Sequence, residues 1–297
     1  MLHLLLTGLI YCSVQVAVFA QTGALKRNIE DLIASKDATV GVAIYGLESK
    51  DAIYINNNKH FPLQSVFKFH IALAVLSEVD RGRLTLNQKI RIKKSDLLPN
   101  TWSPIREKYP QGNVELPLTE VLKYTVAESD NNGCDILLRL IGGTQFVNNY
   151  LHKLGIKEVS IQANEAEMHQ AWDVQFQNWT TPKSTVDLLK LFQERKILSA
   201  KSYDFLWQTM AETVSGKNRI KGQLPAGTVV AHKTGTSGTN DQGITAAIND
   251  IGLVTLPNGT HFAISVLVSN SKESTETNEK IIADITKLSW NYFTSGI

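Results

Sequence analysis

The apolar positions that follow Ser65 recur at steps of three and four residues, as one face of a helix requires. These positions are Phe69, Leu73, Leu76 and Val79. The spacing predicts a helix that continues to Asp80. Between about Phe61 and Met210 the pattern is mostly helical, with loops rich in Pro, Asn and Gly. This middle part of the chain therefore predicts an all-α region.

Runs typical of β-strands lie towards both ends of the chain. They span residues 39–45, 52–55, 228–232, 245–256 and 261–269. The first two surround a polar turn and predict a hairpin, and Pro257-Asn258-Gly259 predicts a turn between the last two. Helices are predicted at Leu25–Ala34 and at Thr277–Phe293.

This order of elements predicts an α/β fold with two lobes. Residues 21–60 and 211–297 would form an antiparallel sheet flanked by helices, and residues 61–210 would form an inserted all-α lobe. The two lobes together would make one domain. Clefts between lobes are common sites of chemistry, so we expect the functional residues where the lobes meet.

Residues 1–20 contain no Lys, Arg, Asp or Glu and end in Val18-Phe19-Ala20. An apolar run of this kind predicts a secretory signal peptide, cleaved near Ala20, and export to the periplasm. The run is nearly long enough to remain as an uncleaved membrane anchor, which is the alternative. Cys12 would suggest lipid attachment, but the bulky Tyr11 before it argues against that.

Cleavage leaves 297 − 20 = 277 residues, enough for a sizeable core. Their formal charge stays at +2, which favours neither nucleic acid nor an acidic partner. Cys134 would be the only cysteine left, so an internal disulfide is excluded. No Cys/His spacing typical of a metal site appears, and we expect neither a metal nor an organic cofactor.

A serine and a lysine stand three positions apart in Ser65-Val66-Phe67-Lys68. Residues three apart share a face of a helix, so Lys68 can place its amine beside the Ser65 hydroxyl. A serine hydroxyl is a weak nucleophile that needs a neighbouring base. The same pair occurs by chance in many chains, where the serine merely begins a helix. Taken alone, S-x-x-K is a weak indication of a catalytic serine.

A second motif, Ser129-Asp130-Asn131, precedes a helix predicted at residues 132–141. Asp and Asn are ordinary caps at the start of a helix, which is the simpler interpretation. In the functional interpretation Ser129 passes a proton to a leaving group, and Asn131 forms a hydrogen bond with a substrate amide.

A third motif, Lys233-Thr234-Gly235-Thr236, ends a predicted strand. Its simpler interpretation is a basic strand end followed by a flexible turn. In the functional interpretation Lys233 and the hydroxyls of Thr234 and Thr236 bind a substrate carboxylate. Gly235 would leave room for the ligand, and the Thr236 N–H would form an oxyanion hole with the Ser65 N–H.

In this order, S-x-x-K, S-D-N and K-T-G resemble the motif set of class A serine β-lactamases and penicillin-binding proteins. The resemblance covers about Ala24 to Phe293 and includes the β–α–β layout. It implies the two-lobe fold of that family and the hydrolysis of penicillins and cephalosporins through a Ser65 acyl-enzyme, which confers antibiotic resistance. Lys68, or Glu165 acting through water, would be the base for acylation.

Residues Ala163 to His169 match the class A segment R-x-E-x-x-L-N, with Glu165 at the glutamate that activates the hydrolytic water. Ala163 replaces the arginine, and His169 replaces the asparagine that helps to hold the water. Asn178 stands where the family has the aspartate that pairs with that arginine. We therefore expect other contacts to close this loop, a wider floor, and a water bond from the His169 imidazole.

Two further residues follow from the resemblance. Trp102 resembles the aromatic residue that lines the site entrance, with packing in the core as the alternative. Arg219 resembles the arginine that reinforces carboxylate binding behind the K-T-G strand, with a plain surface arginine as the alternative. The positions most similar to the PER- and VEB-type extended-spectrum enzymes are Gln64, Ala163, Asn178 and residues 233–238.

The resemblance leaves two other functions open: a DD-peptidase acting on cell-wall stems, and a penicillin-sensing domain that stays acylated. Glu165 favours the β-lactamase, because the other two would be expected to lack an efficient base for deacylation. We expect a monomer that acts on small β-lactam substrates, binds no nucleic acid and has no stable membrane association after cleavage.

Overall fold

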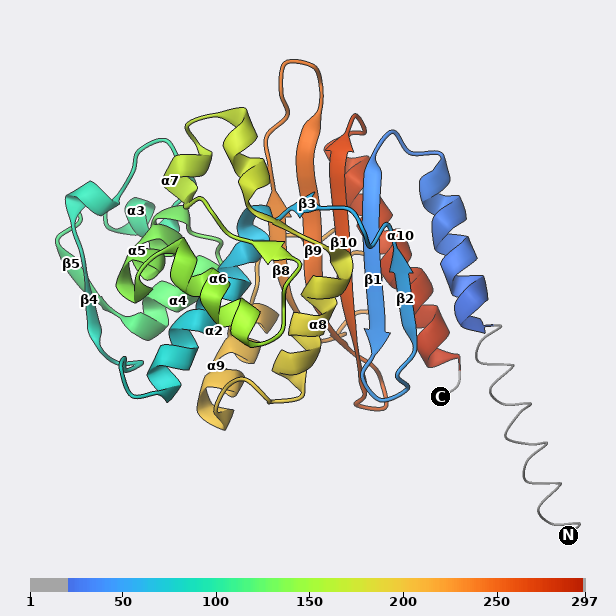
Figure 1. Ribbon diagram of the computed structural model, residues 1–297, viewed down its shortest axis with the longest axis horizontal. Coiled ribbons are helices and arrows are strands. Elements are labelled where there is room, and N and C mark those ends of the chain that lie inside the picture. Colours follow the sequence, from blue (N-terminus) through green and yellow to red (C-terminus); the bar gives the residue numbers. More distant parts are fainter. Residues whose placement is uncertain (1–20, 296–297) are drawn as a thin grey trace, which may run out of the picture.

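The computed structural model describes residues 21–295, and a five-stranded antiparallel sheet built from both ends of the chain lies at its centre (Figure 1). The strands follow the order β2, β1, β10, β9 and β8. They span Thr39–Gly46 (β1), Ala52–Ile55 (β2), Val230–Thr236 (β8), Thr245–Thr255 (β9) and His261–Ser271 (β10). The predicted hairpin and the predicted C-terminal strands are confirmed.

The strand β8 extends further than the sequence predicts. It continues past His232 because the K-T-G motif keeps pairing with β9, from Lys233 opposite Ile251 to Thr236 opposite Ile248. The motif therefore lies within an edge strand of the sheet and not in a turn after it. A paired strand holds its backbone in one register, which fixes where each side chain of the motif points.

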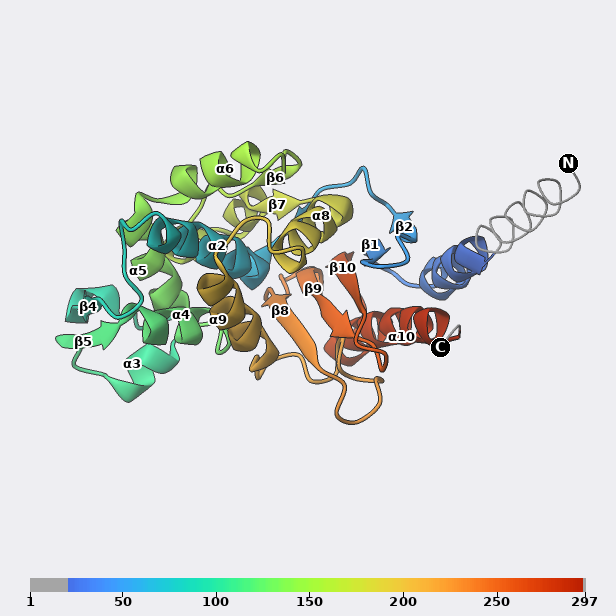
Figure 2. The same cartoon turned by 90° about the horizontal axis from the view of Figure 1, so that it is seen from below.

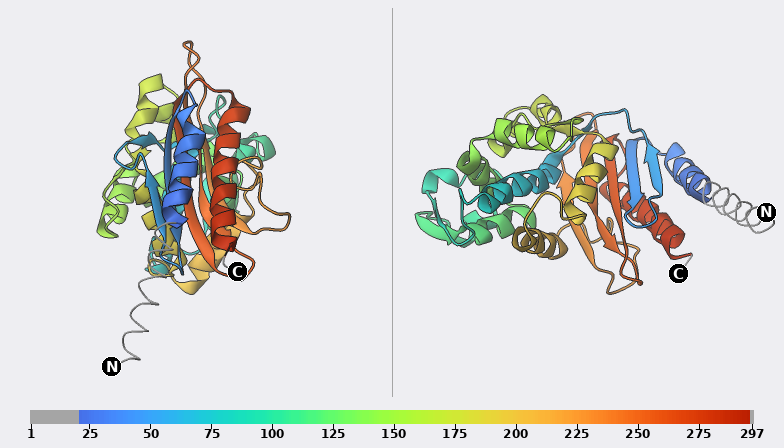
Figure 3. Two further views of the ribbon diagram at one scale, coloured as in Figure 1. Left: turned by 90° about the vertical axis from the view of Figure 1, so that its right-hand side faces the viewer. Right: turned by 60° about the horizontal axis from the view of Figure 1, so that its bottom comes forward.

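Helices cover both faces of the sheet (Figure 2). Residues 21–34 are helical and lie beside α10 (Thr275–Thr294) on one face, as Figure 3 shows. The opposite face packs against α8 (Pro182–Gln193) and the helical lobe. The predicted helices at both ends are confirmed, each a few residues longer than the pattern indicated.

The helix α2 (Phe67–Asp80) runs through the middle of the helical lobe. The pattern predicted one apolar face, yet every residue from Phe67 to Glu78 is buried. The reason is that neighbouring helices surround α2 on several sides, so that its polar face also meets protein. These neighbours are α4 (Leu118–Val126), α5 (Asn131–Ile141), α6 (Thr144–Lys153) and α9 (Ala200–Ala211).

Residues 61–210 also contain short strands, which the expectation of an all-α lobe did not include. They are β3 (Phe61–Pro62), β6 (Val159–Ser160) and β7 (Trp179–Thr180) in one small sheet, and β4 (Lys89–Ile92) and β5 (Val114–Pro117) in another. Two short helices complete the lobe, α3 (Pro104–Lys108) and α7 (Glu165–Met168). Single 3₁₀ turns lie at Gln64–Val66 (η1), Lys94–Asp96 (η2) and Trp172–Gln177 (η3).

One hydrophobic core joins the two lobes. Its buried residues come from α2 and from the facing side of the sheet, where they include Ala231, Ile251 and Leu267. A second core fills the space between the sheet and α10. Within residues 21–295, no helix has the length and apolar character needed to cross a membrane. The predicted signal peptide, residues 1–20, lies outside the described residues.

Candidate active site

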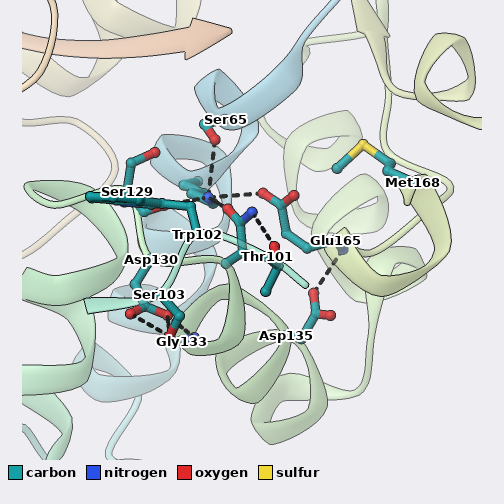
Figure 4. Close-up of polar contacts among 12 residues, drawn as sticks. Ser65, Thr101, Trp102, Ser103, Ser129, Asp130, Gly133, Asp135, Glu165 and Met168 are labelled. Atoms are coloured by element: carbon teal, nitrogen blue, oxygen red, sulfur yellow. Dashed lines mark hydrogen bonds and ion pairs between the residues drawn. The ribbon is translucent and has the colours of Figure 1, made fainter. Parts of the chain in front are cut away.

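Ser65, Ser129 and Glu165 lie around one place in the site (Figure 4). The side chain of Lys68, in the first turn of α2, contacts all three. Its Nζ is 3.0 Å from Ser65 Oγ and 2.8 Å from Glu165 Oε1. It also donates to the Ser129 carbonyl oxygen at 2.8 Å and to Asn131 Oδ1. A fully buried amine needs such partners, because an unpaired buried charge is costly. The residues of the first two motifs thus meet at one nitrogen.

The segment Ser129-Asp130-Asn131 enters α5 through a strained turn. Ser129 has a φ of 60°, which is uncommon for a residue with a side chain and is typical of functional sites. Asp130 is the N-cap: its carboxylate accepts from the N–H groups of Gly133 and Ile105, both at 2.7 Å. The simple cap interpretation therefore holds for Asp130, and this cap places Ser129 and Asn131 at the cleft.

The third motif reaches the same place from β8. Lys233 Nζ lies 3.0 Å from Ser129 Oγ. Ser129 therefore contacts both buried lysines, Lys68 through its carbonyl and Lys233 through its hydroxyl. Burial lowers the pKa of Lys233 well below its ordinary value, the nearby Lys68 lowers it further, and the charges of Asp250 and Glu165 oppose the shift.

Gly235 has a different role from the one expected. A Cβ at this position would lie 2.6 Å from the Leu63 carbonyl oxygen and 3.2 Å from Val66 Cγ2. The space beside the glycine is therefore filled by the protein itself, in the segment that carries Ser65, and the expected room for a ligand is not there. The absent side chain instead lets β8 approach η1 closely.

Arg219 is buried and fastens the same strand, so it is not the plain surface arginine of the alternative. Its guanidinium donates to the carbonyl oxygens of Gly235 (3.1 Å) and Asn249 (3.0 Å) and to Thr236 Oγ1 (2.8 Å), and pairs with Glu279 at 3.1 Å. The hydroxyl of Thr234, the remaining polar side chain of the motif, lies 2.6 Å from Ser215 Oγ.

Glu165 begins the short helix α7, and its position depends on Asp135 of α5. The Asp135 carboxylate accepts from the N–H groups of Glu165 (2.8 Å) and Ala166 (3.0 Å). Burial raises the pKa of Asp135 to about 6, and the charge of Glu165 adds to the shift. Asp135 is a site residue that the motifs do not indicate, although it lies on the predicted helix four residues after Asn131, on the same face.

The loop that carries Glu165 is closed by Asn178. Its Oδ1 accepts from the N–H groups of Gln162 (2.7 Å) and Ala163 (2.9 Å), and its Nδ2 donates to the Ala163 carbonyl at 2.7 Å. A neutral, fully buried amide thus closes the loop. Beside the loop lies a cavity of about 210 Å³, whose lining includes Leu98, Asp135, Glu165, Ala166 and His169.

His169 does not have the geometry expected of a water ligand. Its Nδ1 lies 2.9 Å from the Glu165 carbonyl oxygen, and its Nε2 lies 3.3 Å from Thr101 Oγ1. Both ring nitrogens therefore already have protein partners, and the imidazole links α7 to the segment around Thr101. Trp102, in the same segment, is 57% exposed, and its indole N–H donates to the backbone carbonyl oxygen of Glu128 at 2.8 Å. This side chain therefore lies at the rim of the cleft and not in the core.

This arrangement suits acyl transfer followed by hydrolysis. A serine hydroxyl has an amine within hydrogen-bond distance, which is the geometry of an activated nucleophile. A carboxylate on the other side of that amine can serve as a base for water. The burial that raises the pKa of Cys134 well above its usual value excludes this neighbouring thiol as a competing nucleophile.

The chain belongs to the β-lactamase enzyme family, whose model matches residues 24–293. Structural neighbours include solved class A β-lactamases, so both the predicted fold and the predicted class are confirmed.

Individual relatives agree with this membership. The chain is 55% identical to β-lactamase VEB-1 of Pseudomonas aeruginosa over 276 residues, which cover 92% of each chain. It is 45% identical to extended-spectrum β-lactamase PER-1 of Pseudomonas aeruginosa over 273 residues, 92% of this chain and 88% of the relative. The crystal structure of the TLA-1 extended-spectrum β-lactamase superposes with a TM-score of 0.91, at 57% identity, over 92% of this chain and 99% of that one.

Proposed function

We propose that Ser65 is the nucleophile with which this β-lactamase opens its substrates. Its hydroxyl oxygen attacks the β-lactam carbonyl carbon, the C–N bond of the ring breaks, and an ester to Ser65 forms. Lys68, at 3.0 Å, is placed to accept the hydroxyl proton, with Glu165 acting through water as the alternative base. The observation that carries the proposal is the Lys68 amine held between Ser65 and Glu165.

Ser129 is proposed to return a proton to the ring nitrogen as it leaves. The Ser129 hydroxyl oxygen accepts a hydrogen bond from Lys233, and the Ser129 carbonyl oxygen accepts one from Lys68. When the hydroxyl gives up its proton, an ammonium group is therefore adjacent to replace it. Asn131 uses its Oδ1 for Lys68 and one N–H for Thr101 Oγ1 at 2.6 Å. A second N–H of the same amide remains to bind the side-chain carbonyl of the drug.

Glu165 is proposed to activate the water that hydrolyses the ester. Its carboxylate faces Lys68 within the site, and Asp135 fixes its backbone. Lys233, the hydroxyls of Thr234 and Thr236, and Arg219 behind the strand are proposed to bind the substrate carboxylate. The N–H groups of Ser65 and Thr236 would hold the oxyanion.

The extended substrate range is part of the proposal. It rests on the loop closed by a neutral amide, on the cavity beside that loop, and on the resemblance to enzymes named extended-spectrum. We expect cefotaxime and ceftazidime to be hydrolysed, with Trp102 at the rim of the cleft. Their kcat/KM values, measured against benzylpenicillin on one preparation, test this. If both drugs decay no faster with the enzyme than in buffer alone, the proposed extended substrate range is wrong.

We also propose that the mature chain works in the periplasm as a monomer, after removal of residues 1–20. The apolar composition of that segment supports export. Within the mature chain, residues 21–60 and 211–297 are assigned to the α/β lobe and residues 61–210 to the helical lobe. Sizing of the exported protein and sequencing of its N terminus test these assignments.

The central experiment combines nitrocefin turnover with intact-protein mass spectrometry. The wild type should turn over nitrocefin steadily, whereas a DD-peptidase or a sensor would give one stoichiometric burst. Ser65→Ala should fold and form no adduct with benzylpenicillin. Ser77→Ala is the matched control, because Ser77 is a buried serine of α2, the helix that follows Ser65, and its hydroxyl donates to the Ala74 carbonyl. An adduct of undiminished yield on Ser65→Ala would remove Ser65 as the nucleophile.

A further inference from the structure

A histidine and an aspartate form a fully buried pair directly beneath the K-T-G motif. His232 precedes Lys233 on β8, and Asp250 lies on the neighbouring strand β9, where it is opposite Thr234. His232 Nδ1 is 3.0 Å from both carboxylate oxygens of Asp250, and both side chains are 0% exposed. Because side chains alternate along a strand, the pair lies on the sheet face covered by α10, and Lys233 points to the other face.

The pair has a defined hydrogen-bonding direction. Two lone pairs facing each other would repel, so His232 Nδ1 carries a proton and donates it to the carboxylate. Among residues 21–295, His232 Nε2 has no hydrogen-bond partner. The Asp250 carboxylate is thus the one hydrogen-bonding contact of this ring. Burying two polar groups costs free energy unless they form a hydrogen bond with each other. The bond between His232 and Asp250 links strands β8 and β9 behind the cleft.

Asp250 also contacts the backbone next to Arg219. Its Oδ2 accepts from the Ile220 N–H at 3.2 Å, and Ile220 directly follows Arg219. Arg219 itself donates to the carbonyl of Asn249, the residue before Asp250, and to the carbonyl of Gly235. Residues 219–220 are therefore fastened to β9 at two adjacent positions. One of the two contacts depends on the orientation of the Asp250 carboxylate, which His232 sets.

The charges around the pair support a role in carboxylate binding. Asp250 is among the groups that oppose the lowering of the Lys233 pKa by burial. The pKa of Lys221 is lowered by burial and raised by the same carboxylate. Arg219 is paired with Glu279 at 3.1 Å. The Asp250 carboxylate thus acts on two cationic side chains, Lys233 of the K-T-G motif and Lys221.

We propose that His232 is a positioning residue for recognition of the substrate carboxylate. By donating to Asp250 it holds that carboxylate on the Ile220 N–H, and so keeps Arg219 against Gly235 and Thr236. This inference rests on the proposed function, since it concerns the group that Lys233 and Arg219 are proposed to bind. Its consequence is specific: His232 contributes to the reaction of substrates that carry a carboxylate and not to that of substrates that lack one.

The test compares benzylpenicillin with its methyl ester, which has the same ring but no free carboxylate. The quantity measured is the ratio of kcat/KM for the acid to kcat/KM for the ester. His232→Leu should lower this ratio at least tenfold, mainly through a higher KM for the acid. His232→Asn should recover most of the ratio, because its amide N–H can still donate to Asp250.

Val254→Ala is the matched control, since it removes buried volume from the same core without touching Arg219. It should lower the melting temperature and leave the ratio within twofold of the wild type. If His232→Leu does not fold, Asp250→Asn takes its place and should lower the ratio, because an NH2 group replaces one of the two oxygens that accept from His232 and from the Ile220 N–H.

Equal losses for acid and ester, or an unchanged ratio, would overturn the proposal and leave the pair a purely structural role. A wild type that turns over neither compound would instead contradict the proposed function itself. The two failures are therefore distinguishable in one set of assays.

Discussion

The two walls of the cleft are built in different ways. The K-T-G wall is a strand paired along its length with β9, and its buried lysine follows from backbone register. The Glu165 wall is a loop held by single side chains that reach backbone groups. Asp135 binds the N–H groups of residues 165–166, and Asn178 binds those of residues 162–163. The strand is held by many backbone hydrogen bonds along its length. The loop depends on a few side-chain contacts that one substitution can remove.

The largest expected difference between the walls concerns catalysis. Glu165→Ala should acylate normally and then stall, because the ester no longer meets an activated water. Loss of a positioned base lowers the rate by about 10² to 10⁴-fold. Lys233→Ala, on the other wall, should slow acylation and accumulate no ester. Rapid-quench mass spectrometry separates the two, and near wild-type turnover by Glu165→Ala would transfer the role to Glu167.

Asn178→Ala tests whether the loop depends on one amide. The substitution leaves the N–H groups of Gln162 and Ala163 without their acceptor and removes the donor to the Ala163 carbonyl, and each unsatisfied group at the buried Ala163 costs about 1–3 kcal/mol. We expect the free energy of unfolding to fall by on the order of 2 to 4 kcal/mol. Urea denaturation measures it. A loss below about 0.5 kcal/mol, the usual size of a surface change, would show that other contacts close the loop.

Asp135→Asn tests the second of the two side chains that hold the loop, through the pH dependence of stability. The folded-state pKa of Asp135 is raised from 3.8 to about 6, so the folded protein binds this proton more tightly than the unfolded chain. Its contribution to stability is therefore present below about pH 4 and is lost as the pH rises to 6, by on the order of 3 kcal/mol.

The Asp135→Asn variant should lack this loss, so its stability relative to the wild type should improve from pH 4 to pH 6. Urea denaturation at several pH values measures the difference. A difference that stays constant across this range would contradict the assigned pKa. One of the two N–H groups loses its acceptor in the variant at every pH, which shifts the curve without changing its slope.

Gly235→Ala addresses the strand wall and has the smallest expected effect on stability. The added methyl group would meet the Leu63 carbonyl oxygen at 2.6 Å, and overpacking of this kind costs about 1–3 kcal/mol. Gly238→Ala is the matched control, because the described part of the chain leaves open space within 4 Å of its Cβ position. Thermal unfolding and nitrocefin turnover compare the two. Equal behaviour of both variants would mean that η1 adapts and that the close approach is not required.

The same contrast explains what the sequence could predict. The strands, the terminal helices and the adjacency of Ser65 and Lys68 follow from periodicity, because register and helix spacing carry side chains to known faces. The meeting of the three motifs was implied by the family resemblance. The roles of Asp135 and Asn178 did not follow, since each contact joins residues far apart in the chain and depends on one side-chain orientation. His169 was assigned to water because nothing in the sequence indicates that Thr101 and the Glu165 carbonyl lie beside its ring.

Burial produced the other differences. The repeat after Ser65 indicated one apolar face of α2, but no sequence window reports how many helices will pack around it. Gly235 was expected to give space to a ligand, whereas the approach of η1 takes that space. In both cases the packing partner comes from a part of the chain that no local sequence window contains.

The hydrophobic core that runs from α2 into the sheet has a mechanical consequence. Lobes that are joined only by linkers can move relative to each other. Here Ala231, Ile251 and Leu267 of the sheet belong to the same hydrophobic core as the helix that carries Lys68. Opening the walls would expose that interior to water, so the width of the cleft is set at folding. A rigid inhibitor that is complementary to the cleft could therefore bind without a conformational opening of the enzyme. New drugs with larger side chains can be accommodated only where the loop yields.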